Sequence, residues 1–77
     1  NTVVYFNSTK DLLNITTVNS GFGEIKLYSM SGELVLVKDV DFSKGSEVEI
    51  DVSRLPKGVD VVKINDGNGI FSKKILK

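Results

Sequence analysis

Apolar and polar residues alternate along most of this chain, and this alternation restricts the fold more than any other feature. It is clearest in the segment EVEIDV, where Val48, Ile50 and Val52 lie on one side and three carboxylates lie on the other. Because successive side chains of a β-strand point to opposite faces of a sheet, this segment predicts a strand with one buried and one solvated face. No segment shows the i, i+3, i+4 spacing of an amphipathic helix, so the sequence predicts an all-β protein.

Turn-forming residues divide this pattern into short runs. Clusters of Gly, Asn, Asp and Ser interrupt the alternation about every ten residues, as turns between strands do. The expected strands cover residues 3–6, 11–17, 23–29, 33–40, 47–52, 59–65 and 70–76. Strands of this length and spacing are typical of packed antiparallel sheets, so the predicted fold is a small immunoglobulin-like antiparallel β-sandwich of about seven strands.

The chain is long enough for only one hydrophobic core. Its 77 residues lie below the usual size of a domain, so we expect a single domain over residues 1–77. The sequence contains no cysteine, and packing must therefore stabilise the fold without disulfides. It begins at Asn1 with neither an initiating Met nor the pattern of a secretory leader, so we expect a fragment of a larger protein.

The charge and composition narrow the range of functions. Lys and Arg total 10 and so do Asp and Glu, a balance that disfavours nucleic acid or an anionic membrane as the main partner. No stretch approaches the roughly 20 apolar residues that a membrane-spanning helix needs. The sequence has no His and no Cys, so the usual general bases and soft metal ligands are missing. We therefore expect no enzymatic activity, no cofactor and no small-molecule substrate.

Two groups of residues have alternative chemical interpretations. Glu47, Glu49 and Asp51 line one strand face about 7 Å apart, a spacing that two carboxylates on either side of a sugar bond could use. A solvated strand face explains these acids equally well, and we favour it. The segment DGNG at residues 66–69 resembles the start of a calcium-binding loop, but no Glu follows at the required spacing. A tight hairpin turn is the favoured interpretation.

Asp60 interrupts the alternation of the sixth expected strand. It shares a strand face with Val62 and Ile64. If those two side chains point inward, an unpaired carboxylate beside them would cost several kcal/mol to bury. We therefore expect Asp60 at the rim of the sheet, where it reaches solvent or a partner.

Three blocks of sequence carry a resemblance to a known family. The first is VYFNSTKDLLNI, the second is EIKLYSMSGELVL, and the third joins IDVSRLPKGVDVVKI to GNGIFSKKILK. In order and spacing they resemble the type A C-terminal sorting domains of the type IX (Por) secretion system. The family pattern is V-Y-P-N-P-x-x-D-x-L-x-I, then an apolar hairpin with Tyr-x-x-x-Gly, then D-x-S-x-L-x-x-G-x-Y-x-x-x-I and K-K-I-x-K. The chain differs at Phe6 and Ser8, where the family usually has prolines, and at Asp60, where it usually has an aromatic residue.

The resemblance implies a C-terminal secretion and sorting signal that directs a cargo protein across the outer membrane. The implied partners are the outer-membrane secretion translocon, a sortase-like peptidase and an upstream cargo domain. The implied route leads through the periplasm to the cell surface or the extracellular space, with the tail cleaved or used for surface attachment. The positions that match the family's functional residues, and that we expect the translocon to recognise, are Gly58, Lys73, Lys74, Ile75, Leu76 and Lys77.

Other functions remain open at this point. A non-catalytic β-sandwich module that binds carbohydrate, or a passive spacer of a secreted enzyme, would have the same fold, although the absence of Trp disfavours a sugar platform. The terminal lysines would set the register against an acidic receptor, or would merely protect an edge strand from aggregation. A weak homodimer formed by edge-strand pairing is a further alternative.

Overall fold

The computed structural model describes residues 2–17, 21–42, 47–67 and 69–77. The strands are β1 (Thr2–Asn7), β2 (Leu12–Thr17), β3 (Phe22–Ser29), β4 (Leu34–Asp41), β5 (Glu47–Asp51), β6 (Val59–Asn65) and β7 (Ile70–Leu76). Each strand end lies within one residue of its predicted position, so the predicted all-β structure is confirmed. Within the described ranges, no helix is long and apolar enough to cross a membrane.

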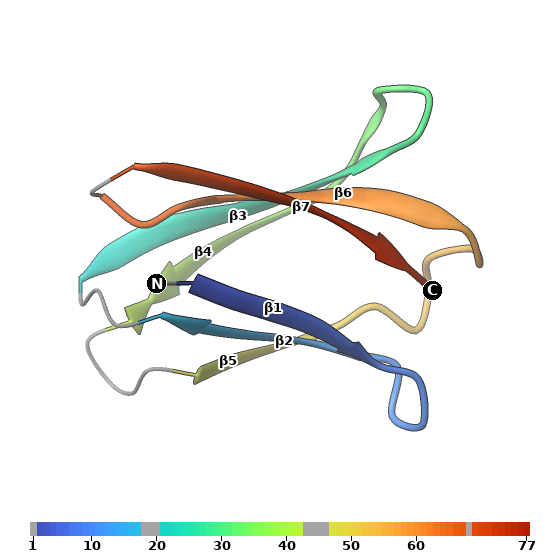
Figure 1. Cartoon of the computed structure of the whole chain (residues 1–77), viewed down its shortest axis with the longest axis horizontal. Helices are drawn as coiled ribbons and strands as arrows, with labels where there is room; N and C mark the ends of the chain where they lie inside the picture. The colour runs from blue at the N-terminus through green and yellow to red at the C-terminus, as the bar shows by residue number, and fades with distance from the viewer. Residues whose placement is uncertain (1, 18–20, 43–46, 68) are drawn as a thin grey trace.

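The strands form two antiparallel sheets that pack face to face (Figure 1). The three-stranded sheet has the order β1-β2-β5, and the four-stranded sheet has the order β4-β3-β6-β7. In an immunoglobulin constant domain the fourth strand joins the sheet of the first, second and fifth strands, whereas here β4 pairs with β3. The other strands keep the immunoglobulin arrangement, which confirms the predicted sandwich with one strand moved to the opposite sheet.

The core lies between the sheets and takes one face of each sheet. In β3 the inward side chains Ile25 and Leu27 have no exposed surface, and in β2 the same holds for Leu13 and Ile15. The buried apolar side chains of the described residues are Val4, Leu13, Ile15, Ile25, Leu27, Val40, Phe42, Ile50, Val52, Val62, Ile64 and Ile75. Both sheets thus contribute to one core, as the alternation in the sequence predicts.

Asp60 lies on the inward, apolar face of β6. It is the second residue of β6 and pairs with Ser29, the last residue of β3, so it lies near the end of the sheet as predicted, although it belongs to the buried polar residues. Ile75 lies opposite Asp60 on β7, and only 9% of Asp60 is exposed. Among the described residues, Asn14 Oδ1 is the fully buried side-chain atom without a hydrogen-bond partner, so neither carboxylate oxygen of Asp60 is both fully buried and unpaired.

Gly23 lets β3 pass close to the end of β6. A Cβ atom at this position would lie 2.5 Å from the Asn65 backbone oxygen and 2.8 Å from the Phe42 ring. The Asn65 oxygen belongs to the backbone of the neighbouring strand, so it cannot move aside without disturbing the sheet. The close approach of β3 to the Asn65 backbone oxygen therefore requires glycine at position 23.

Replacing Gly23 by alanine is expected to lower the free energy of unfolding by about 1–3 kcal/mol, the usual cost of overpacking. Gly69→Ala is the matched control, because a Cβ atom at Gly69 meets nothing within 4 Å. Urea unfolding followed by circular dichroism measures both variants. Equal stability of the two variants would contradict the close approach at Gly23.

Candidate functional site

The C-terminal strand β7 lies at the edge of the four-stranded sheet and pairs only with β6. The pairing continues past the end of the strand, because the Lys77 amide donates to the Gly58 oxygen at 2.8 Å and the Gly58 amide donates to the Lys77 oxygen at 3.3 Å. Gly58 has a φ of 146°, a conformation that favours glycine. The structure therefore brings the predicted site residues together, with Gly58 beside the end of segment 73–77.

Alternate residues of this site lie on opposite faces of the sheet. Ile75 is 7% exposed and belongs to the core. Leu76 is 72% exposed, and Lys74 is exposed beside it on the outward face. Because side chains alternate along a strand, Lys73 and Lys77 share the inward side with Ile75. The site thus has an inward set of side chains and an outward set. The inward set is Lys73, Ile75 and Lys77, and the outward set is Lys74 and Leu76.

Lys73 extends from β7 to the other sheet. Its Nζ donates to the Val4 backbone oxygen at 2.7 Å. Val4 lies in β1, an edge strand of the three-stranded sheet that lies beside β7 (Figure 1). An edge strand leaves backbone groups without a strand partner, and here a lysine ammonium provides a donor. The bond joins the two sheets along this side of the sandwich.

Lys77 holds the connection between β5 and β6. Its Nζ donates to the Val52 oxygen at 2.6 Å and also donates to the Leu55 oxygen through a shorter bond. The Leu55 amide donates to the same Val52 oxygen at 3.1 Å, which closes a turn. Hydrogen bonds from a charged donor are stronger than neutral ones, so the ammonium fixes this turn against the end of β7.

Asp51 ends β5 at the start of the same connection. The Ser53 amide donates to Asp51 Oδ1 at 2.9 Å. This bond, a hydrogen bond from the Ser53 side chain, and the positive charges of Arg54 and Lys77 lower the pKa of the Asp51 carboxyl, despite an opposing effect of desolvation. The folded domain therefore favours the ionised form of Asp51.

The acidic face of β5 bonds to an amide of β2. Asn14 Nδ2 donates to Glu47 Oε2 at 3.2 Å and to Glu49 Oε2 at 3.4 Å. Only 4% of Asn14 is exposed. Within the part of the chain that the structure describes, no group of three acidic, histidine or cysteine side chains is placed to hold a metal ion. These carboxylates thus act as acceptors for the neighbouring strand.

The segment at residues 66–69 forms the turn between β6 and β7. The Asp66 amide donates to the Gly69 oxygen at 3.2 Å, and the Gly69 amide donates to Asp66 Oδ1 at 3.1 Å. Gly67 has a φ of 88°, which a turn of this kind uses glycine to reach. Asn68 lies outside the described residues. The hairpin interpretation of this segment is confirmed.

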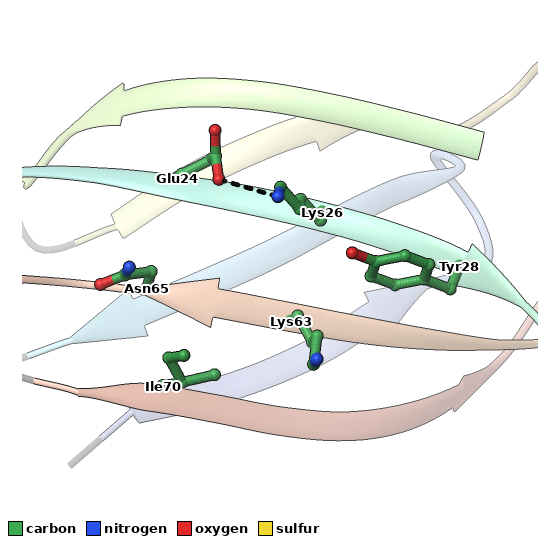
Figure 2. A pocket seen from close by; sticks show the side chains of 6 residues that line it. All are labelled: Glu24, Lys26, Tyr28, Lys63, Asn65 and Ile70. Atoms are coloured by element: carbon green, nitrogen blue, oxygen red, sulfur yellow. Dashed lines mark ion pairs between the residues drawn. The ribbon is translucent and has the colours of Figure 1, made fainter. Parts of the chain in front are cut away.

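The outward face of the four-stranded sheet carries a small hollow over β3, β6 and β7 (Figure 2). Its volume is about 120 Å³, and it is lined by Glu24, Lys26, Tyr28, Lys63, Asn65 and Ile70. Glu24 and Lys26 form an ion pair at 3.4 Å. Lys63 Nζ lies 5.8 Å from the centre of the Tyr28 ring, within the range of a cation–π contact. Around the hollow, Glu24 and Lys26 thus compensate each other, while Lys63 keeps its positive charge over the Tyr28 ring.

The fold and the terminal strand define a class of protein, a small immunoglobulin-like sandwich whose last strand is an edge strand tied to both sheets. A family model for secretion system C-terminal sorting domains matches residues 3–77. The chain therefore belongs to the family of type IX (Por) secretion C-terminal sorting domains, which confirms the resemblance found in the sequence. No curated protein and no solved structure matches the chain.

Membership in this family assigns the chain a role. The domain is a C-terminal sorting signal of type IX secretion, and domains of this family are non-catalytic signals. The role implies contact with the secretion machinery, an upstream cargo domain, and export to the cell surface or the extracellular space.

Recognition by the translocon stays a prediction for the six matched positions. Val59 and Val61, which were not predicted as site residues, lie on β6 beside the outward residues of the terminal strand. Val61 pairs with Lys74 and Val59 pairs with Leu76. The short turn at residues 66–69 was the available signal, because a tight hairpin fixes the register of its two strands.

Replacing Asp51 by asparagine is expected to destabilise the domain at neutral pH but not at low pH. Because the folded-state pKa is lowered, the carboxylate contributes stability above the unfolded-state pKa of about 4, and this contribution is lost as the pH falls through the folded-state pKa. Urea unfolding of both proteins, from about pH 7 down to about pH 2, measures the difference. A difference that does not shrink with falling pH would contradict the lowered pKa.

Replacing Lys77 by methionine keeps the apolar stem but removes the ammonium. We expect a loss of about 1–2 kcal/mol in the free energy of unfolding, because the Val52 and Leu55 oxygens lose a charged donor. Lys74→Met is the matched control, since this exposed side chain should change stability by less than about 0.5 kcal/mol. Chemical unfolding measures both values. Similar losses in the two variants would argue against a structural role for Lys77.

Proposed function

We propose that this domain directs an upstream cargo protein through the outer-membrane translocon of the type IX system, after the cargo has reached the periplasm. The domain forms a single unit over residues 1–77 of a larger secreted protein. A sortase-like peptidase then removes it while the cargo is attached to the cell surface or released. The match of residues 3–77 to the sorting-domain family carries this proposal.

A core within the domain supports a signal that is separate from its cargo. The buried side chains of both sheets pack into one cluster. A domain with its own core keeps its fold when it is joined to different neighbours. The same tail can therefore serve as a signal at the end of an unrelated cargo.

The terminal strand supports recognition at Gly58 and residues 73–77. β7 has a strand neighbour on one side only. Its outward side chains Lys74 and Leu76 are exposed. An edge strand with exposed side chains offers a receptor both backbone groups and specific contacts. Binding at this end of the molecule accounts for the sequence pattern that continues to the terminal lysine.

Export of a fluorescent reporter tests the proposal. The reporter carries an N-terminal signal peptide and residues 1–77 at its C-terminus, in a host with a working type IX system. We expect this fusion to reach the cell surface or the medium, and a fusion without residues 73–77 to stay in the periplasm. The same full fusion in a host without the translocon should also stay in the periplasm.

The truncation removes a buried residue, Ile75, together with the bonds of Lys77. Resistance of the periplasmic fusions to added protease therefore accompanies the export measurement. Retention of the full fusion in the periplasm, with its domain folded, would sink the proposal. A carbohydrate-binding or spacer role would then take its place.

A further inference from the structure

An exposed apolar patch lies on the outward sheet face at the C-terminal end of β7. We name this group the terminal patch; its members are Tyr28, Met30, Val59, Val61 and Leu76, with Lys74 at the margin. Val61 pairs with Tyr28 on β3 and with Lys74 on β7. Val59 and Leu76 pair in the next row. Met30 lines a second hollow, separate from that of Figure 2, together with Tyr28 and Val61.

Three members of the terminal patch, Met30, Val59 and Leu76, are exposed, and Tyr28 and Val61 are half-buried. Leu76 is 72% exposed and Met30 is 59% exposed. Single exposed apolar side chains are common, but a contiguous group on one sheet face marks an interaction surface more often. The terminal patch therefore needs a partner of matching chemistry.

The charge around the terminal patch is positive. Lys63 lies against the Tyr28 ring, and Lys74 stands at the margin. The two rows of the patch contain no outward carboxylate, and Glu24, further along β3, is paired with Lys26. The exposed Glu33 lies in the same turn as Met30, where its backbone bonds to Ser29. Lys63 and Lys74 thus leave the margin with an excess of positive charge. A surface that offers apolar side chains bordered by carboxylates would complement this arrangement.

Two of the three lysines near the C-terminus are already bound within the domain. Lys73 and Lys77 donate to backbone oxygens of the strand and the connection beside β7. A partner that captured these ammonium groups would leave the carbonyl groups without their donors. Lys74 makes no hydrogen bond or ion pair with the described residues. Its ammonium is available to a partner without cost to the fold.

A second copy of the chain fits the terminal patch poorly. Two terminal patches packed face to face would bring Lys63 and Lys74 of one copy close to those of the other. Like charges brought together in an interface reduce the binding free energy by several kcal/mol. The positive margin thus favours a different, acidic partner.

We propose that the terminal patch is the surface through which the secretion machinery binds this domain, and that its partner offers apolar side chains bordered by carboxylates. Lys74 and Leu76 contact this partner. Lys73 and Lys77 are positioning residues, which hold β7 so that its outward side chains face the partner. The inference rests on the proposed function, and it divides the predicted recognition residues into groups with different effects on export.

Export of the reporter fusion and the melting temperature of the purified domain separate these groups. Leu76→Thr is matched by Phe22→Thr, because Phe22 is 80% exposed at the opposite end of the same sheet face. Lys74→Glu is matched by Lys10→Glu, a charge reversal at an exposed position between β1 and β2. Each pair makes the same chemical change inside and outside the terminal patch.

We expect Leu76→Thr and Lys74→Glu to reduce export roughly tenfold each, with melting temperatures close to that of the wild type. Phe22→Thr and Lys10→Glu should be exported like the wild type. Wild-type export of both patch variants would overturn the inference. An equal loss of export in the controls would overturn it as well.

The positioning residues give a different signature. Lys73→Met and Lys77→Met should lower the melting temperature, and their loss of export should recover at a lower growth temperature, where more of the domain is folded. Unchanged melting temperatures with a loss of export at every growth temperature would show direct recognition of these lysines. That result would overturn the division into contact and positioning residues.

Two further outcomes separate this inference from the proposed function. If the wild-type fusion is not exported, the proposed function fails and the inference falls with it. If the wild-type fusion is exported and the patch variants match it, only the choice of surface is wrong.

Light scattering of the purified domain tests self-association, and a dimer that Leu76→Thr abolishes would assign the terminal patch to a second copy and overturn the inference.

Discussion

β7 pairs with β6 on one side and packs Ile75 into the core, and two lysine side chains tie it to the segments on its other side. Lys73 donates to a backbone oxygen of β1, and Lys77 donates to two backbone oxygens of the connection between β5 and β6. Because these two side chains and Ile75 turn inward, alternation leaves Lys74 and Leu76 on the outward face. The interactions that hold the strand therefore also determine which of its residues a partner meets.

The strands could be predicted from the sequence because their pattern is local. In β5, for example, the buried side chain of Ile50 lies between the exposed Glu49 and Asp51. The sheet to which each strand belongs depends on contacts between distant residues, which a local pattern does not contain. For this reason the pairing of β3 with β6 and of β2 with β5 does not follow from the local pattern, whereas β3 and β4 are joined by a short turn as the expected apolar hairpin. The low exposure of Asp60 is likewise not contained in the local pattern, because its neighbours Ser29 and Ile75 lie on other strands.

The sequence could locate the candidate site, but it could not tell which of its residues hold the fold and which face solvent. The resemblance to the family marks the positions near the C-terminus, yet the partners of their side chains lie far away along the chain. Lys73 bonds to Val4 across 69 positions, and Lys77 bonds to Val52 across 25 positions. Only the packing of the two sheets brings these groups together, so a lysine that holds the fold and a lysine that faces solvent look the same in the sequence.

The directions of β1 and β7 have a mechanical consequence. β1 begins on one side of the molecule and β7 ends on the opposite side (Figure 1). A force between an upstream cargo and the end of β7 would act along these strands. Since the hydrogen bonds of antiparallel strands lie across the strand direction, such a force loads many of them at once and does not peel them apart in turn. A force applied between these two ends would therefore act on the sandwich in shear.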